Sequence, residues 1–373
     1  MSLLIDDDTR MLRDAAQRYF SESDSLRSLR RLRNARDLAG VARGLWDGIV
    51  ELGLAGVLVP EVFGGSGLKA VASTQVSEMM GSTLATGPFL SSAVMAATAI
   101  TYGGNDRLKA EILPAIASGM IVSLATEESG RHRPTAITTT VRRASTRYAL
   151  TGRKIAVIDG NIADKFIVAA RQEDGDLLLF LVDASAPGIT VFSHMGLDSH
   201  PAVEIMLNDT PVSEIDTICA AKQSAELLDR IYDTGRIHLA AEMLGAAQYA
   251  FDQAIDYLKT RVQFGRKIGE FQALQHRAAL MFGELEIARS LVLKAASTYD
   301  ADDPRRQEFA SLAKARVGEI AKHVVTEAVQ MHGGIGVTDD FDMGLFLKRV
   351  KAASERLGDS AFHAERYAQL QGL

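Results

Sequence analysis

The chain of 373 residues exceeds the usual size of one hydrophobic core, so its length predicts two or three domains. Apolar residues make up 47% and charged residues 24%, as in ordinary globular proteins, and the formal net charge of -6 disfavours a nucleic-acid binder. The single cysteine, Cys219, excludes an intrachain disulfide and a zinc site made of thiolates, so we expect no bound metal.

The N-terminal segment and the apolar runs favour neither a secreted nor a membrane protein. No apolar run reaches the eighteen or more residues that cross a bilayer. The segment from Met1 to Asp8 is acidic, whereas a secretory signal begins with basic residues. We therefore expect a soluble cytoplasmic protein that associates with no membrane.

Residues 1–117 have a helical pattern that is interrupted by glycine-containing breaks at 64–67, 87–88 and 103–104. Trp46 is expected in the core, because a lone Trp is more often buried than part of a ligand site. The glycine-rich segment 59–67 lacks the Lys-Ser/Thr ending of a phosphate-binding P-loop, so it is interpreted as a turn.

Residues 118–216 change to short runs of strand composition, which begin near Tyr148, Phe166, Leu177 and Ile189 and are separated by glycine turns. This spacing favours a small β-sandwich or barrel. No Gly-x-Gly-x-x-Gly follows a strand, so nothing supports a Rossmann fold.

Residues 217–373 return to helical periodicity in four long segments, which predict a four-helix bundle: 217–260, 270–299, 305–331 and 340–370. The predicted architecture is therefore an α+β multidomain fold with an N-terminal helical domain (1–117), a middle β-barrel (118–216) and a C-terminal four-helix bundle (217–373).

The polar stretch Arg261–Gln272 joins the first two of these helices. Its two glycines, Gly265 and Gly269, allow the chain to reverse, so the flanking helices are expected to be antiparallel. Arg261 offers a planar set of donors suited to a phosphate, and Gln272 offers both donors and acceptors.

In three places the chain resembles the acyl-CoA dehydrogenase family of flavoproteins. The stretch 261–272 resembles the family signature between the first two C-terminal helices, and 328–336 resembles the signature after the third. The segment 52–67 resembles the N-terminal domain. Because the matches follow the family's order and spacing, the resemblance implies the family fold in a tetramer or dimer, with FAD as cofactor and acyl-CoA as substrate.

In that family FAD lies between subunits, so the two C-terminal signatures would contact the adenylate and pyrophosphate of a flavin held mainly by a neighbouring chain. Glycines leave the backbone open to phosphates, although Gly333 and Gly334 alone would also suit a helix C-cap. His332 is expected to be packed. The resemblance implies these cofactor-binding residues: Arg261, Gln263, Phe264, Phe271, Gln272, Gln330, Gly333 and Gly334.

The family's catalytic base is missing from both of its usual positions. Leu357 stands where a Glu removes the substrate's α-proton, and Gly235 occupies the alternative position on the first long helix. Asp359 or Glu355 could be a displaced base, but neither is assigned as catalytic. Asp233 and Arg236 either form an ion pair or contact the CoA and acyl part of the substrate.

The middle domain departs from the family as well. Thr126-Glu127 is retained but the following Gly-Ser-Asp turn is not, and the Trp-Ile-Thr/Ser that contacts the flavin ring is replaced by 156–158, which read Ala-Val-Ile. Residues for the chain's own site are altered, whereas residues that serve a neighbour's FAD are retained.

This pattern favours the base-lacking subunit of a heteromeric α2β2 acyl-CoA dehydrogenase, as in members that act on bulky CoA esters such as steroid side chains, with electron-transfer flavoprotein as the electron acceptor. Three alternatives stay open. The chain could be a self-sufficient homomeric dehydrogenase that uses Asp359, a flavin monooxygenase on the same fold, or a scaffold without flavin.

Overall fold

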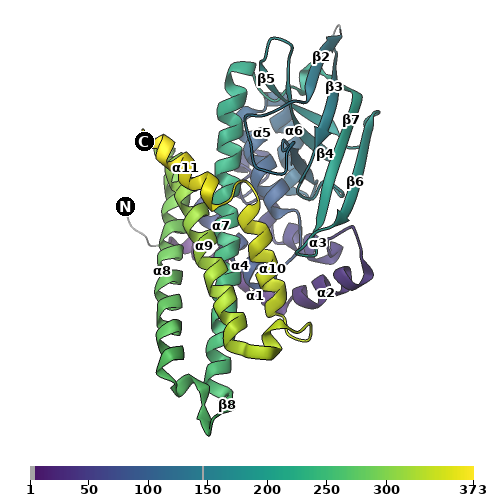
Figure 1. Ribbon diagram of the computed structural model, residues 1–373. Helices are drawn as coiled ribbons and strands as arrows, with labels where there is room; N and C mark the ends of the chain where they lie inside the picture. Colours follow the sequence, from purple (N-terminus) through teal and green to yellow (C-terminus); the bar gives the residue numbers. More distant parts are fainter. Residues whose placement is uncertain (1–4, 145–146) are drawn as a thin grey trace. The chain divides into compact units, whose positions relative to one another are not determined.

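A computed structural model describes residues 5–144 and 147–373 (Figure 1). The chain forms two compact units, each built from segments far apart in sequence. Unit 1 contains Ala70–Ala85, Arg236–Leu373 and the N-terminal segment up to Arg27, and unit 2 contains Ser28–Lys69 and Thr86–Gly235. Because these units follow packing rather than sequence pattern, the domain boundaries predicted after residues 117 and 216 stay predictions.

Unit 1 is helical. Helix α9 packs against α8, α10 and α11, while α4 packs against α1 and α8. The C-terminal helical domain predicted from periodicity is therefore confirmed. Its elements are α1 (Asp7–Glu22), α4 (Ala70–Thr83), the second part of α7 (Ala221–Thr260), η5 (Ile268–Glu270), α8 (Gln272–Asp300), α9 (Arg306–His332), η6 (Gly333–Val337), α10 (Met343–Glu355) and α11 (Ser360–Leu370).

Two glycines let α4 and α7 cross with their backbones in contact. A Cβ on Gly245 of α7 would lie 1.8 Å from the carbonyl oxygen of Glu78, and one on Gly81 of α4 would lie 2.0 Å from that of Glu242. Only glycine fits at such a distance. Nearby, the Arg289 guanidinium donates to the Glu78 carboxylate and so also joins α8 to α4.

The fourth predicted helix, 340–370, is wrong in one respect, because it is two helices rather than one. The break between α10 and α11 lies at Leu357 and Gly358, whose φ angles are 56° and 105°. Asp359 then begins α11 by accepting a hydrogen bond from the Phe362 amide at 2.8 Å. A left-handed pair followed by a capping carboxylate ends one helix and starts the next.

Unit 2 combines helices with the sheet. Trp46 is buried and donates to the Gly119 carbonyl, so its predicted core position is confirmed. The segment 59–67 forms a turn, as predicted, around a short 3-10 helix. The helices are most of α2 (Ser25–Ala35), α3 (Arg43–Glu51), η1 (Leu54–Gly56), η2 (Glu61–Phe63), η3 (Phe89–Ala96), α5 (Ala97–Gly103), α6 (Asp106–Ala117), η4 (Glu214–Asp216) and the first part of α7.

The described strands of unit 2 form one seven-stranded mixed sheet in the order β1-β4-β2-β3-β7-β6, with β5 paired to β4. Alternate side chains of these strands, such as Phe166, Phe180 and Ile205, form its core. The predicted middle β domain is confirmed, and because β1 and β6 lie at opposite ends of the order it is a half-barrel. The strands are β1 (Val122–Ala125), β2 (Thr140–Ala144), β3 (Arg147–Lys154), β4 (Lys165–Arg171), β5 (Leu177–Asp183), β6 (Ile189–Met195) and β7 (Pro201–Ser213).

In the part of the chain that the structure describes, every helix is too short or too polar to cross a bilayer.

Candidate functional site

The stretch 261–272 is a β-hairpin at the end of two long helices. Strands β8 (Val262–Gln263) and β9 (Arg266–Lys267) pair antiparallel, and the turn residues Phe264 and Gly265 have φ angles of 53° and 79°. Two positive φ angles are typical of a type I′ hairpin turn. The hairpin joins α7 to α8 at the lower end of Figure 1, so the predicted reversal of the chain is confirmed.

The tip of this hairpin presents its side chains outward. Phe264 is 89% exposed, and Val262 beside it is also exposed. The rings of Phe264 and Phe271 lie 6.1 Å apart, and Arg266 lies over the Phe271 ring at 4.4 Å. Exposed apolar side chains grouped in this way are typical of a surface that contacts another molecule.

The polar side chains of the hairpin are similarly available. Within the described residues the Arg261 guanidinium forms no hydrogen bond or ion pair, and Gln272 is exposed at the first position of α8. Among the described residues, the Gln263 side-chain amide donates only to the neighbouring carbonyl of Val262. A free guanidinium beside exposed amides is a donor set that suits a pyrophosphate.

The second predicted cofactor segment lies at the same end of unit 1. His332 closes α9, and its ring packs 4.6 Å from the rings of both Tyr257 and Phe341. Its Nδ1 lies 2.7 Å from the Ala328 carbonyl oxygen, so the packed role predicted for His332 is confirmed. Because Tyr257 lies one turn before Arg261, this ring contact holds the end of α9 near the hairpin.

Gly333 and Gly334 follow directly on an exposed surface, with Gln330 also exposed. A Cβ on either glycine would meet nothing within 4 Å, so the backbone there is open to a ligand. Gly333 also acts as a C-cap, because its amide donates to the Gln330 carbonyl and its φ is 66°. The capping role and an approach by phosphate are compatible at these residues.

Where the family base would stand, the Leu357 side chain is buried. Glu355 pairs with Lys351 at 2.8 Å on the surface. Asp359 is exposed, and its carboxylate caps α11. Both candidate replacement bases therefore lie at the surface and interact with other groups, away from the buried position of Leu357.

Three buried basic side chains hold the backbone of this loop. Arg236 and His363 both donate to the Leu357 carbonyl, at 3.3 and 3.0 Å. Lys314 donates to the carbonyls of Ser354 and Gly358, at 2.9 and 3.0 Å. Burial and the neighbouring Arg236 charge lower the pKa of Lys314 to about 7. Burial, with Arg236 and Lys314 nearby, lowers the pKa of His363 so far that its imidazole is neutral.

Asp233 and Arg236 are both fully buried on α7. Arg236 supports the loop described above and lies over the Phe362 ring at 5.7 Å. The contact of either residue with a substrate stays a prediction.

A buried ion pair, which no sequence pattern indicated, fixes the altered turn after β1. The Lys154 ammonium contacts the Glu128 carboxylate and the Ala169 carbonyl, and Glu128 also accepts from Thr138 and Thr139. Burial opposes the ionisation of Glu128, but Lys154 and these hydrogen bonds outweigh it and lower its pKa to about 2. Burial lowers the pKa of Lys154 to about 8 despite the attraction of Glu128.

A second polar cluster lies beside this turn. The Glu127 carboxylate lies 2.6 Å from His132 Nδ1, and the His132 ring packs edge-on against Tyr232 at 5.1 Å. The Tyr232 hydroxyl in turn donates to the Thr126 hydroxyl at 2.8 Å. The retained Thr126 and Glu127 are thus engaged within unit 2, and Ala156, which replaces the family's aromatic residue, is exposed with a φ of 51°.

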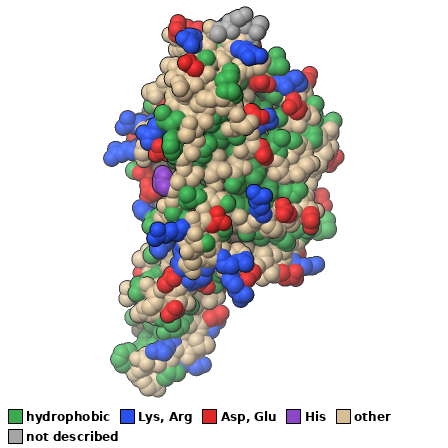
Figure 2. Space-filling model, turned by 90° about the vertical axis from the view of Figure 1, so that its right-hand side faces the viewer, with side chains coloured by type: hydrophobic (Ala, Val, Ile, Leu, Met, Phe, Trp, Pro, Cys, Tyr) green, Lys and Arg blue, Asp and Glu red, His purple; other side chains and the backbone are tan. Residues whose placement is uncertain are grey.

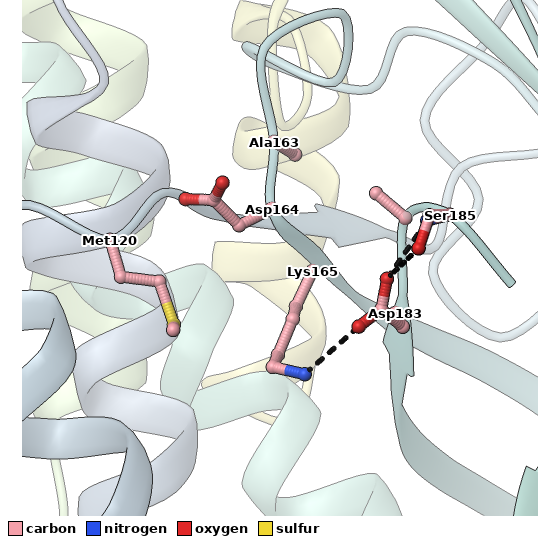
Figure 3. Close-up of a pocket in the computed structure, with 7 residues that line it drawn as sticks. Met120, Ala163, Asp164, Lys165, Asp183 and Ser185 are labelled. Atoms are coloured by element: carbon pink, nitrogen blue, oxygen red, sulfur yellow. Dashed lines mark hydrogen bonds and ion pairs between the residues drawn. The ribbon is translucent and has the colours of Figure 1, made fainter.

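An open cavity of about 550 Å³ with a mixed polar and apolar lining lies elsewhere in unit 2, beside the beginning of β4 and the end of β5 (Figure 3). Lys165 points toward Asp183 at 3.4 Å, and Asp183 also accepts a hydrogen bond from Ser185. None of the predicted site residues lines this cavity. Because this open cavity lies apart from those residues, it is assigned no role.

Comparison with known proteins identifies three consecutive family domains in the chain. Residues 6–120 match the acyl-CoA dehydrogenase N-terminal domain, 123–210 the middle domain and 228–370 the C-terminal domain. The chain is similar to "Probable acyl-CoA dehydrogenase YngJ" of Bacillus subtilis, with 31% identity over 313 residues, or 81% of this chain and 82% of that protein.

Solved structures share the fold over the whole chain. One is described as the electron transferring flavoprotein of Acidaminococcus fermentans, with a TM-score of 0.91 and 27% identity over 100% of this chain and 99% of that one. Another is the ChsE4-ChsE5 complex from Mycobacterium tuberculosis, with a TM-score of 0.89 and 25% identity over 100% of this chain and 99% of that one.

Proposed function

This chain belongs to the acyl-CoA dehydrogenase family of oxidoreductases, and we propose that it is the base-lacking subunit of a heteromeric member. In this role it completes the FAD site of a partner chain, which supplies the catalytic base. The reaction is the α,β-dehydrogenation of an acyl-CoA thioester.

The observation that carries the proposal is the buried Leu357 in the place of the base. Bound FAD would supply the acceptor for the hydride of the substrate's β-carbon, and the reaction would also need a carboxylate to remove the α-proton. A leucine cannot take a proton, and a general base must approach its proton to ~3 Å. The pairing of Glu355 with Lys351 and the capping of α11 by Asp359 support the proposal that neither serves as this base.

The hairpin and the end of α9 carry the residues that would contact the FAD of a neighbouring chain. Arg261 would pair with the pyrophosphate, while Gly333 and Gly334 would let the backbone approach the phosphates. Gln272 and Gln330 would bond the ribose, adenine or phosphate oxygens. Phe264 and Gln263, which the hairpin exposes, and the partly exposed Phe271 would form the remaining contacts.

Two comparisons support the assembly and the electron acceptor. A similar chain occurs in a complex of two differently named proteins, ChsE4 and ChsE5, which supports a heteromer. Another occurs in a structure described as an electron transferring flavoprotein, which supports such a protein as the electron acceptor. The acyl group is not assigned.

The proposal is tested by purifying the chain alone and together with a paralogous acyl-CoA dehydrogenase chain encoded beside it. We expect acyl-CoA-dependent dye reduction only from the co-purified pair. Dye reduction and retained flavin in the lone chain would instead establish a self-sufficient enzyme.

A further inference from the structure

His332, the last residue of α9, lies between the two segments that the proposed function assigns to the cofactor. The centroid of its ring is 4.6 Å from that of Tyr257 on α7 and 4.6 Å from that of Phe341, which follows η6. Rings at this distance pack directly against each other. Because only 4% of its surface is exposed, His332 is a buried link between the ends of α7 and α9. We call Tyr257, His332 and Phe341 the ring clamp.

Tyr257 connects the ring clamp to Arg261 through the backbone. The Arg261 amide donates to the Tyr257 carbonyl at 2.8 Å, and the Arg261 carbonyl accepts from the Ile268 amide at 2.9 Å across the hairpin. Figure 2 shows hydrophobic side chains at the lower end of the view, where Figure 1 places the hairpin, with Lys and Arg side chains beside them. The main chain of Arg261 is thus held on both sides, whereas its guanidinium has no partner among the described residues.

Gly336 brings the glycine turn back against the same histidine. A Cβ on Gly336 would lie 3.0 Å from the His332 Cβ and 2.6 Å from the Val329 carbonyl oxygen, so only glycine lets η6 pack this closely on the end of α9. His332 Nδ1 lies 2.7 Å from the Ala328 carbonyl oxygen, which holds the ring in one orientation. The open backbone at 333–334 is therefore anchored to His332 from both sides.

We propose that His332 is a positioning residue, which holds Arg261 and the open backbone of Gly333 and Gly334 in place for one pyrophosphate. The inference rests on the proposed function, in which these three residues contact the FAD of a neighbouring chain. Two segments from different helices bind one ligand tightly when their separation is fixed beforehand, because less freedom is then lost on binding. His332 acts through the packing of its ring rather than by touching the ligand.

Two substitutions separate the ring from the rest of the side chain. In the co-purified assembly, His332→Leu removes the ring from the clamp, whereas His332→Phe retains a ring and loses only the hydrogen bond to Ala328. His323→Leu is the matched control, because this histidine lies on the same helix but pairs with Glu284 of α8 at 2.7 Å. FAD is removed from each assembly, and its rebinding is followed by flavin fluorescence.

We expect His332→Leu to raise the Kd for FAD about tenfold, because the two segments lose their fixed separation. His332→Phe and His323→Leu should bind FAD as tightly as the parent assembly. Unchanged affinity in His332→Leu would overturn the proposal. Equal losses in His332→Leu and His332→Phe would overturn it too, since packing of a ring would then not be what places the two segments.

A double variant distinguishes positioning from a general loss of structure. If His332 acts by placing Arg261, His332→Leu should raise the Kd by a much smaller factor in the Arg261→Gln background than in the parent, because the side chain that it places is gone. Equal factors in both backgrounds would refute the positioning role. Phe341→Leu, which opens the clamp from the loop after η6, replaces His332→Leu in both measurements if that variant does not fold.

Arg261→Gln alone separates this inference from the proposed function. If that variant binds FAD as tightly as the parent assembly, the proposed FAD contact itself is wrong, and the positioning role is wrong with it. If Arg261→Gln weakens FAD binding but His332→Leu does not, only the positioning role is refuted. Both results come from binding alone, so neither requires the assembly to turn over a substrate.

Discussion

Asp359 shows how the place of one residue in the backbone decides its chemistry. Its sequence position, two residues after Leu357, left it open as a displaced base. The left-handed φ angles of Leu357 and Gly358 turn the chain at this point, so the carboxylate faces outward and caps α11. Sequence spacing could not predict this, because the direction of a side chain after a left-handed pair depends on the three-dimensional turn.

Substituting Asp359 separates capping from catalysis. Asparagine is an equally good N-cap, so Asp359→Asn should leave both stability and the turnover of the assembly unchanged. Asp359→Ala should lower the free energy of unfolding by about 1 kcal/mol without changing turnover. Urea unfolding and dye reduction measure the two quantities. Loss of turnover in Asp359→Asn would identify it as the base and favour the self-sufficient reading.

The buried pair of Glu128 and Lys154 makes a second prediction at this scale. Removing one partner leaves the other charge buried, so Glu128→Gln should lose ~3 to 5 kcal/mol of stability at pH 7. Replacing both, as Glu128→Leu with Lys154→Met, should cost much less. The midpoints of urea unfolding of the parent chain, Glu128→Gln and the double variant measure these differences in stability. A double variant less stable than Glu128→Gln would contradict the prediction that removing one partner costs more than removing both.

The pH dependence of the same pair has a defined sign. The pKa of Glu128 falls from 4.5 to about 2 on folding, so its ionisation contributes stability above pH 4.5 that is lost as the pH falls through 2. Glu128→Gln should therefore lose less stability than the parent chain between pH 4.5 and 2. Parallel acid-unfolding curves for the two proteins would contradict this.

At the scale of elements, helical periodicity predicted α7, α8 and α9 to within a few residues, because apolar residues recur along each of them at the three- and four-residue spacing of a helix. It missed the break at Leu357, where a single glycine and a leucine in the left-handed region end the helix. The hairpin was also missed, since Phe264-Gly265 is not a common type I′ sequence. Lys314 lies between two alanines on α9, and nothing in that local pattern indicates that it holds a loop 40 residues away.

The crossing of α4 and α7 predicts an unusually costly substitution. A methyl group on Gly245 would overlap the Glu78 carbonyl, so Gly245→Ala should lower the free energy of unfolding. The loss should be several times the ~1 kcal/mol by which alanine stabilises a free helix relative to glycine. Gly283→Ala on α8 is the matched control, because its Cβ would meet nothing within 4 Å and should stabilise. Thermal unfolding compares them, and a stabilised Gly245→Ala would show that the backbones do not touch.

For the whole molecule, the order of helices, strands and helices together with three separated motifs allowed the fold to be predicted, and the family domains confirm it. The half-barrel could not be told from a barrel, because closure depends on which strands meet rather than on strand composition.

The proposed role divides the molecule into retained and altered parts. The hairpin and the end of α9 lie together in unit 1 with open backbone and with an Arg261 side chain that is unpaired among the described residues, whereas the loop at Leu357 presents a buried leucine. In unit 2, the ion pair of Glu128 and Lys154 fixes the turn after β1. A chain with these features is expected to act on a neighbour's flavin rather than on one of its own.

The flavin-to-protein ratio of the chain, alone and with its partner, tests this claim most directly. We expect almost no FAD in the lone chain, bound FAD in the assembly, and loss of that FAD when Arg261→Gln is introduced into this chain only. Arg316→Gln, an exposed arginine on α9, is the control and should retain the cofactor. One FAD per lone chain, or an assembly whose FAD is indifferent to Arg261, would contradict the account.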